Sequence, residues 1–345
     1  MKDNYKLLNN WNHLLKYFNL EQKDTFFTEE YSKLYELENQ KVHCFYYSKN
    51  GFHFLFPFIL REFQIEENIY YDFETIYGYG GPIYNYYNEE HISNAWISFF
   101  EYGYSKNYIA GLIRFHPLLN NYKCFDIVGK LLRDRQTVAV DLKLSEDEIW
   151  VNEIHSKNRN SIKKGEKNGL QFIADYNFKY LEEFKTLYKN TMIKLDANQF
   201  YFFDDEYFNK LKKTIEKSFI GIVLLNSEVI ASAIIFFSDY YGHYHLAGSN
   251  SQYLNLSPNN FLIWNCIKEL KGKGIKYFHL GGGTNSDENN SLFEFKRKFS
   301  KNRFDFFLGK IIFNIDVYQT LCDDWSKINS NSEQFYKKYL LKYKY

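Results

Sequence analysis

Apolar runs of strand length alternate along the chain with stretches of helical periodicity. The runs are rich in β-branched and aromatic residues, as strands are. They occupy residues 42–47, 52–60, 108–115, 137–142, 218–225, 229–237, 241–248, 275–280 and 303–312. Two pairs of runs are separated by turn residues, Ser48–Gly51 in the first pair and Asn226–Glu228 in the second, which predicts two β-hairpins.

Helical periodicity fills most of the intervals between these strands. The predicted helices occupy residues 1–40, 89–106, 145–169, 178–194, 204–217, 257–272, 291–299 and 316–343. One of them has clear end signals. Ser145 and Glu148 form a capping-box pattern, and Asn168-Gly169 is typical of a helix C-terminus.

The two halves of the chain repeat the same order of elements in outline. Each offers helices, an antiparallel hairpin, a further strand, a glycine-containing loop, a helix and a strand. This order predicts a mixed α/β fold, with mostly antiparallel sheets flanked by helices. A chain of 345 residues is long for one domain. We expect two domains, residues 1–145 and 146–345, with a C-terminal helix closing the second.

Composition and charge narrow the classes of function. The net charge is +1, from 43 Lys and Arg against 42 Asp and Glu, so no global field attracts nucleic acid or membranes. Aromatic residues make up 21% of the chain, and nucleotide bias accounts for this most simply. The four cysteines show no metal-ligand spacing. There is neither a signal-peptide pattern nor an apolar run of membrane-spanning length, so we expect a soluble, cytoplasmic protein.

The strand at residues 275–280 leads into Gly281-Gly282-Gly283 and then into a short basic helix around Lys296. Three glycines let the backbone approach a ligand where a Cβ would clash. Open α/β sheets bind ligands beyond the C-terminal ends of their strands. This loop therefore has two interpretations, a ligand site or a simple connection.

Other residues offer chemistry without a specific pattern. Arg159, Lys163 and Lys167 recur every four residues and form a basic ridge that could bind phosphates or simply face solvent. A general base is harder to assign, and the candidates are Glu294, Asp287 and Asp196. His243 and His245 share one face of a strand, but without a third ligand they predict no metal site.

Taken in order, several motifs resemble the FemABX-like branch of the GNAT acyltransferase superfamily. The resemblance covers roughly residues 40–320. It rests on Tyr77–Pro82, Arg114–Pro117, Lys157–Gly169, Phe200–Phe203, Leu280–Gly283 and Phe295-Lys296. This family includes aminoacyl-tRNA-dependent transferases that build peptidoglycan cross-bridges, and relatives that acylate amino sugars or peptides.

The resemblance implies two tandem GNAT-like domains that transfer an acyl group to an amine. It implies that Lys296 lies at the reacting centre. We add Glu294, which flanks this lysine, as the second predicted catalytic residue. It also implies that an arginine, Arg159 or Arg114, holds acceptor phosphates. The predicted substrate-binding residues are Arg159, Lys163, Arg114, Gly281, Gly282, Gly283 and Tyr79.

Two departures from the family leave the donor open. The chain lacks the coiled-coil insertion of cross-bridge transferases, and it lacks the glycine cradle that binds acetyl-CoA in ordinary GNAT enzymes. Residues 255–260 (Asn-Leu-Ser-Pro-Asn-Asn) stand in that place and offer a helix start instead. Acyl-CoA and aminoacyl-tRNA both remain possible as co-substrate, and the even charge balance slightly favours a donor other than tRNA.

We therefore predict an N-acyltransferase that acts on a nucleotide-linked or lipid-linked amino-sugar or peptide precursor of the cell envelope or a surface glycan. One alternative is a tRNA-dependent peptidoglycan cross-bridge transferase. Another, of a different class, is a non-catalytic GNAT-like module that binds glycans or peptides. No metal cofactor is expected, and the sequence leaves the oligomeric state open.

Overall fold

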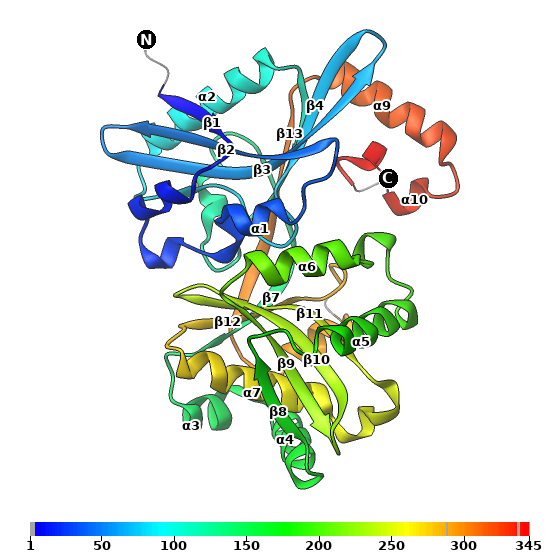
Figure 1. The fold of residues 1–345 in the computed structure, drawn as a ribbon. Coiled ribbons are helices and arrows are strands. Elements are labelled where there is room, and N and C mark those ends of the chain that lie inside the picture. The colour runs from blue at the N-terminus through cyan, green and yellow to red at the C-terminus, as the bar shows by residue number, and fades with distance from the viewer. Residues whose placement is uncertain (1–3, 288, 337–338, 345) are drawn as a thin grey trace. The chain divides into compact units, whose positions relative to one another are not determined.

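The computed structural model describes residues 4–287, 289–336 and 339–344. The chain forms two compact units (Figure 1). Unit 1 comprises Met1–Gln22, Phe26–Asp134 and Phe306–Tyr345, and unit 2 comprises Lys23–Thr25 and Arg135–Asp305. No helix in the described part of the chain is long and apolar enough to span a bilayer.

The sheet of unit 1 is mostly antiparallel. Its strands lie in the order β1 (Tyr5–Leu8), β2 (Gln40–Lys49), β3 (Phe52–Ile65), β4 (Asn68–Glu74), β6 (Tyr108–Arg114) and β13 (Arg303–Ile312), with β5 (Ile83–Tyr84) paired to β3. The helices are α1 (Glu29–Lys33), α2 (Glu89–Ser105), α9 (Ile315–Ile328) and α10 (Glu333–Tyr336). β4 and β6 are the one parallel pair among these strands, and α2 connects them.

Local sequence explains the central hairpin and the core of unit 1. Asn50 and Gly51 both adopt positive φ, 50° and 78°, as the two-residue turn between β2 and β3 requires. Aromatic rings then fill the space between the sheet and α2. The ring centroids of Phe56, Phe73 and Phe99 lie 5.3–6.0 Å apart. The ring planes meet at 62–89°, so the rings pack edge to face.

The strands of unit 2 include both parallel and antiparallel pairs. They lie in the order β7 (Lys130–Asp141), β12 (Tyr277–Gly282), β11 (Tyr241–Ser249), β10 (Glu228–Phe237), β9 (Ser218–Leu225) and β8 (Gln171–Asp175). The helices are α3 (Glu146–Glu148), α4 (Ser156–Lys167), α5 (Leu181–Lys194), α6 (Asp205–Thr214), α7 (Pro258–Gly272) and α8 (Ser291–Lys296). β11 and β12 are parallel, and α7 connects them.

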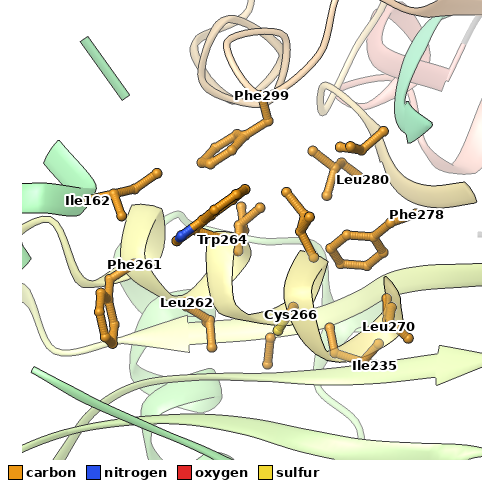
Figure 2. Close-up of a cluster of buried hydrophobic side chains, with 14 of the residues drawn as sticks. Ile162, Ile235, Phe261, Leu262, Trp264, Cys266, Leu270, Phe278, Leu280 and Phe299 are labelled. Carbon is orange, nitrogen blue, oxygen red and sulfur yellow. The ribbon is translucent and has the colours of Figure 1, made fainter. Parts of the chain in front are cut away.

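Helix α7 lies against the sheet of unit 2 and contributes seven of the 25 buried residues of its core. Leu262, Trp264, Cys266 and Leu270 project from it into a cluster that includes Phe278 of β12 (Figure 2). Helix α5 covers the opposite face of the sheet. It approaches β11 so closely that a Cβ on Gly248 would lie 2.4 Å from the carbonyl carbon of Leu187.

The order of elements confirms the predicted mixed α/β class and its duplication. Each unit has an antiparallel hairpin and a parallel pair connected by a helix. The compact units nevertheless differ from the predicted ranges 1–145 and 146–345. β7, which follows the first half of the chain, pairs with β12 of unit 2. β13, which follows the second half, pairs with β6 of unit 1. Residues 135–145 therefore group with unit 2, and residues 306–345 with unit 1.

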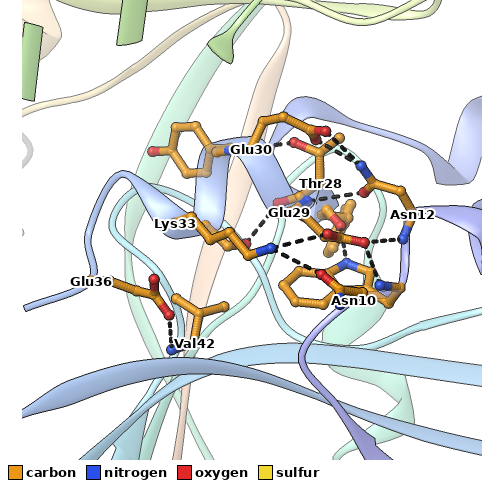
Figure 3. A network of polar contacts seen from close by, with 12 residues as sticks. Asn10, Asn12, Thr28, Glu29, Glu30, Lys33, Glu36 and Val42 are labelled. Atoms are coloured by element: carbon orange, nitrogen blue, oxygen red, sulfur yellow. Dashed lines mark hydrogen bonds and ion pairs between the residues drawn. The ribbon is translucent and has the colours of Figure 1, made fainter. Parts of the chain in front are cut away.

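The predicted amphipathic helix at residues 1–40 is wrong. The described residues there form β1, three short 3₁₀ turns and the five-residue α1. Hydrogen bonds between distant residues hold this arrangement (Figure 3). The Glu29 carboxylate accepts from the backbone N–H groups of Trp11 and Asn12, and Asn12 Nδ2 donates to Glu30 at 2.8 Å. These contacts override the helical periodicity of the sequence.

Two other predicted helices are interrupted. The capping box is confirmed, because Ser145 Oγ accepts from Glu148 N and the Glu148 carboxylate accepts from Ser145 N. The helix that it opens turns into a π-helical segment at residues 149–153 and breaks at Ile154, before α4 begins. The C-terminal segment predicted at 316–343 divides into α9 and α10, and residues 337–338 lie outside the described part.

Candidate active site

The parallel strands β11 and β12 pair over only three residues and then part. The pairs are Tyr241 with Tyr277, Gly242 with Phe278, and His243 with His279. β11 continues to Ser249. Along it, Ile234 and Ile235 of β10 pair with Leu246 and Tyr244, so His245 is the extra residue of a β-bulge. Ligands of α/β sheets bind beyond the C-terminal ends of such strands, which makes this parting the candidate site.

The glycine loop, Gly281–Gly283, overlaps the end of β12, which extends to Gly282. Gly281 adopts φ +78°, and the pairing with β7 shifts register between His279 and Gly281. A Cβ on Gly282 would lie 2.8 Å from the backbone oxygen of Gln136, and one on Gly283 would lie 2.5 Å from Asn290 Oδ1. Gly281 is therefore required by its backbone conformation, and Gly282 and Gly283 by the close approach of the surrounding chain.

Asn290 ties this loop to the start of α8. Its Oδ1 accepts from the backbone N–H groups of Leu292 and Phe293 and so caps the helix. Its Nδ2 donates to Thr284 Oγ1 at 2.7 Å and to Asn285 Oδ1 at 3.2 Å. The loop thus has a defined conformation that directs α8 back toward β12.

Lys296, at the end of α8, is buried beneath the glycine loop. Its residue surface is 8% exposed, and Nζ donates to the carbonyl oxygen of Gly282 at 2.9 Å. Burial lowers the pKa of the Lys296 ammonium to about 7, with a further contribution from the positive charge of Arg135. Burial therefore disfavours the cation that the sequence predicted near the glycines and favours the neutral amine.

Arg135, on β7, is a site residue that sequence analysis missed. Its Nη1 donates to the carbonyl oxygen of Gly283 at 2.8 Å. Nothing in the local sequence distinguishes Arg135 from the other charged residues around it. Its position depends on the pairing of β7 with β12, which brings Thr137 opposite Gly282. Only the long-range pairing of β7 with β12 would have identified Arg135 as a site residue, and the sequence alone did not predict this pairing.

The candidate bases lie apart from this arrangement. Glu294 forms an ion pair with Arg297 at 2.8 Å, on the partly exposed side of α8. Asp287 and Asp196 are exposed. The ion pair of Glu294 with Arg297 joins residues three positions apart on the surface of the helix. The assignment of Glu294 as a catalytic residue remains a prediction.

The basic ridge of α4 is only partly available. Arg159 turns back toward the interrupted helix, and its Nη1 donates to the carbonyl oxygens of Trp150, Val151 and Ile154 at 3.2, 3.2 and 2.5 Å. Lys163 is exposed and lies 5.9 Å from the centroid of the Trp150 ring. Of the predicted phosphate contacts on this helix, Lys163 is the more accessible.

Arg114 and Tyr79 belong to unit 1, not to the unit that contains Lys296. Arg114 Nη2 forms an ion pair with Glu74 at 2.9 Å, and its Nη1 donates to the carbonyl oxygen of Thr75. The Tyr79 ring packs against Phe26 and Phe306, with centroids 5.6 and 5.3 Å apart. Both side chains thus have structural contacts within unit 1, and their binding roles remain predictions.

The two histidines of β11 have polar partners that the sequence did not indicate. His243 Nε2 lies 2.6 Å from Asp24 Oδ2, and both residues are 2% exposed. His245 Nε2 lies 3.0 Å from the hydroxyl of Tyr207 on α6. Burial lowers the pKa of His245 to about 3, so this imidazole is neutral throughout the physiological range.

A cavity of about 620 Å³ lies along α5 at the far end of β11. Most of the residues that line it are polar, including Glu183, Asn190, Glu228 and Gln252, although apolar atoms, among them those of Leu187 and Val229, contribute at least as much of its surface. The Glu228 carboxylate is oriented by the Tyr253 hydroxyl at 2.6 Å. Such a lining suits a hydrophilic ligand better than a lipid chain.

Comparison with known proteins places this geometry in a class. Residues 156–297, which lie within unit 2, match the family described as Acetyltransferase (GNAT) domain. The parted parallel strands, the bulged β11 and the connecting α7 therefore belong to a GNAT-like domain. No curated protein sequence matches the chain.

Among solved structures, the chain has the fold of FemX. The TM-score is 0.68 at 13% identity, with 91% of this chain and 99% of FemX covered. A domain from Agrobacterium fabrum, provisionally assigned to lysylphosphatidylglycerol synthetase, gives 0.55 at 14% identity, covering 88% and 90%. A conserved protein of unknown function from Bacteroides thetaiotaomicron gives 0.52 at 9%, covering 82% and 88%. The predicted resemblance to FemABX-like GNAT proteins is thus confirmed at the level of fold.

Proposed function

We propose that this protein is an N-acyltransferase that transfers an acyl group to an amino group of a cell-envelope or surface-glycan precursor. One observation carries the proposal. In a domain that matches the GNAT family, the parallel strands part beside a glycine loop that buries Lys296. The fold alone supports acyl transfer, and the buried lysine supports a reacting centre at this place.

The chemistry requires two things of the site. The acceptor amine must lose a proton to attack the donor carbonyl, and the oxyanion that forms must find donors. Each well-placed donor in a dry site contributes ~3 kcal/mol to transition-state stabilisation. Lys296, the N–H groups of the glycine loop and those at the bulge in β11 are the groups that we assign to this centre.

For the donor we propose acyl-CoA. The first turn of α7 follows β11 through residues 251–256, and Pro258 at N1 follows Ser257, which has φ +58°. A helix start of this kind offers backbone N–H groups and a favourable dipole to a phosphate without a glycine cradle. Aminoacyl-tRNA is the alternative donor, and the likeness to FemX keeps it open.

For the acceptor we propose a hydrophilic amino-sugar or peptide precursor. The resemblance to FemABX-like proteins implies an amine of the cell envelope, and the polar lining of the cavity along α5 supports a polar molecule. Lys163 is the residue that we propose as a contact for acceptor phosphates, because Arg159 is engaged with backbone carbonyl groups.

Binding of the two donor classes tests this proposal. Acetyl-CoA binding is measured by calorimetry and release of the CoA thiol by a thiol reagent, while retention of charged tRNA is measured at moderate salt. We expect acetyl-CoA to bind and tRNA to be released. Retained tRNA without acetyl-CoA binding would instead assign an aminoacyl-tRNA donor. If neither donor binds or reacts, the protein is a binding module and the enzyme proposal is wrong.

A further inference from the structure

Two basic side chains from different elements hold consecutive carbonyl groups of the glycine loop. Lys296 Nζ on α8 donates to Gly282 O at 2.9 Å, and Arg135 Nη1 on β7 donates to Gly283 O at 2.8 Å. The side-chain carbons of Arg135 also lie beside Gly282, 3.2 Å from the position of its absent Cβ. Arg135 therefore shapes the backbone to which Lys296 is hydrogen-bonded.

The surroundings of Lys296 disfavour a positive charge. In the described part of the chain no carboxylate lies within ion-pair distance of its Nζ. Glu294, on the same helix, is paired with Arg297, and the charged side chain that faces Lys296 from β7 is Arg135. A buried ammonium group without a carboxylate partner loses hydration that a single carbonyl acceptor replaces only in part, so the neutral amine is favoured. The positive charge of the Arg135 guanidinium adds to this effect.

We propose that Lys296 is the general base of the acyl transfer, and that Arg135 is a positioning residue that holds the loop and keeps the Lys296 amine neutral. This assignment rests on the proposed function. It assigns the role of base to Lys296 in place of the candidates predicted from the sequence, Glu294, Asp287 and Asp196. A neutral amine can accept a proton, which the fixed cation predicted from the sequence could not.

The step balances with groups already named. The acceptor nitrogen forms a bond to the thioester carbonyl carbon, and the C–S bond breaks with its electron pair on sulfur. The proton lost from the acceptor nitrogen passes to Lys296 Nζ and from there to the departing thiolate. The products are an amide and free CoA thiol, and no oxidant, reductant or metal ion takes part.

Two lines of evidence test the pair. The first is the pH dependence with which an amine-reactive reagent labels Lys296, read by peptide mass spectrometry, with the exposed Lys301 as internal reference. We expect half-maximal labelling of Lys296 near pH 7 in the wild type. We expect a shift to higher pH in Arg135→Met, and a return toward the wild-type midpoint in Arg135→Lys. The second is the acid limb of the pH profile of kcat/KM. This limb should shift to higher pH in Arg135→Met and return toward the wild-type position in Arg135→Lys.

The outcomes separate this inference from the proposed function. If wild-type Lys296 labels with the same pH dependence as Lys301, the inference is wrong without recourse to any variant. An Arg135→Met protein that is folded but has an unchanged Lys296 midpoint removes the role of Arg135. If Lys296 titrates near pH 7 and no acyl donor reacts, the tuned lysine stands and the acyltransferase proposal fails. If acyl transfer occurs but Lys296 labels like an exposed lysine, the acyltransferase proposal stands and the assignment of Lys296 as base fails.

Discussion

At the scale of single residues, Arg159 has the clearest contact pattern. Its guanidinium donates to three backbone carbonyl groups where the helix after Ser145 is interrupted. Orphan carbonyl groups at a helix end need such donors. Arg159 is thus explained as a structural cap, which its helical spacing with Lys163 did not indicate.

We expect Arg159→Ala to lower the free energy of unfolding by about 1–3 kcal/mol, since hydrogen bonds from a charged donor to partly buried acceptors are lost. Lys163→Ala is the matched control on the same helix, and it should change stability by less than ~1 kcal/mol. Urea denaturation measures both. Equal stabilities of the two variants would show that the contacts of Arg159 contribute nothing.

Residue-scale prediction from the sequence was most specific where local pattern and family resemblance agreed, and the catalytic role that it gives to Lys296 stays a prediction. Lys296 was identified because it follows the glycines at the spacing of the family motif, and the structure places it on the Gly282 carbonyl. Arg135, 161 residues earlier in the chain, had no such signal. The neutral tendency of Lys296 could not be predicted either, because it follows from burial in the folded chain.

At the scale of elements, the contact between α5 and β11 fixes the strand beside the candidate site. A Cβ on Gly248 would meet the backbone of Leu187 and Tyr188 at 2.4–2.6 Å, and Ser249 N donates to Thr191 Oγ1. The parted end of β11 is therefore held by direct helix-on-strand packing, with no side chain between the two backbones.

We expect Gly248→Ala to push α5 away from β11 and to cost about 1–3 kcal/mol of stability, because backbone atoms cannot yield as side chains do. Acetyl-CoA binding should weaken as well. Gly272→Ala, at the end of α7, is the control, since a Cβ there meets nothing within 4 Å. Thermal unfolding and calorimetry measure the two effects. A Gly248→Ala protein as stable as the control would contradict the close packing.

Strands and short turns were predictable from the sequence, whereas interruptions were not. The Asn50-Gly51 hairpin and the Ser145 capping box depend on neighbouring residues, and both are present as predicted. The segment at residues 1–40 depends instead on the Glu29 carboxylate, whose partners lie 17 and 18 residues away. Helical periodicity carries no information about such tertiary hydrogen bonds.

At the scale of the whole molecule, the chain is a duplicated α/β protein in which the closing strands are exchanged. β7 completes the sheet of unit 2 and β13 that of unit 1, so neither unit is a continuous segment. This exchange also supplies Arg135, which reaches the glycine loop of unit 2 from the strand that follows the first half of the chain.

Acyl transfer itself is the most direct test of the central claim. The protein is incubated with acetyl-CoA and a panel of amino-sugar and peptide amines, and acetylated product is measured by mass spectrometry. The wild type and Lys301→Met, which alters an exposed lysine, should form product that depends on acetyl-CoA, and Lys296→Met should form none while still binding the donor. Turnover by Lys296→Met at the wild-type rate would contradict the assignment of the reacting centre to Lys296.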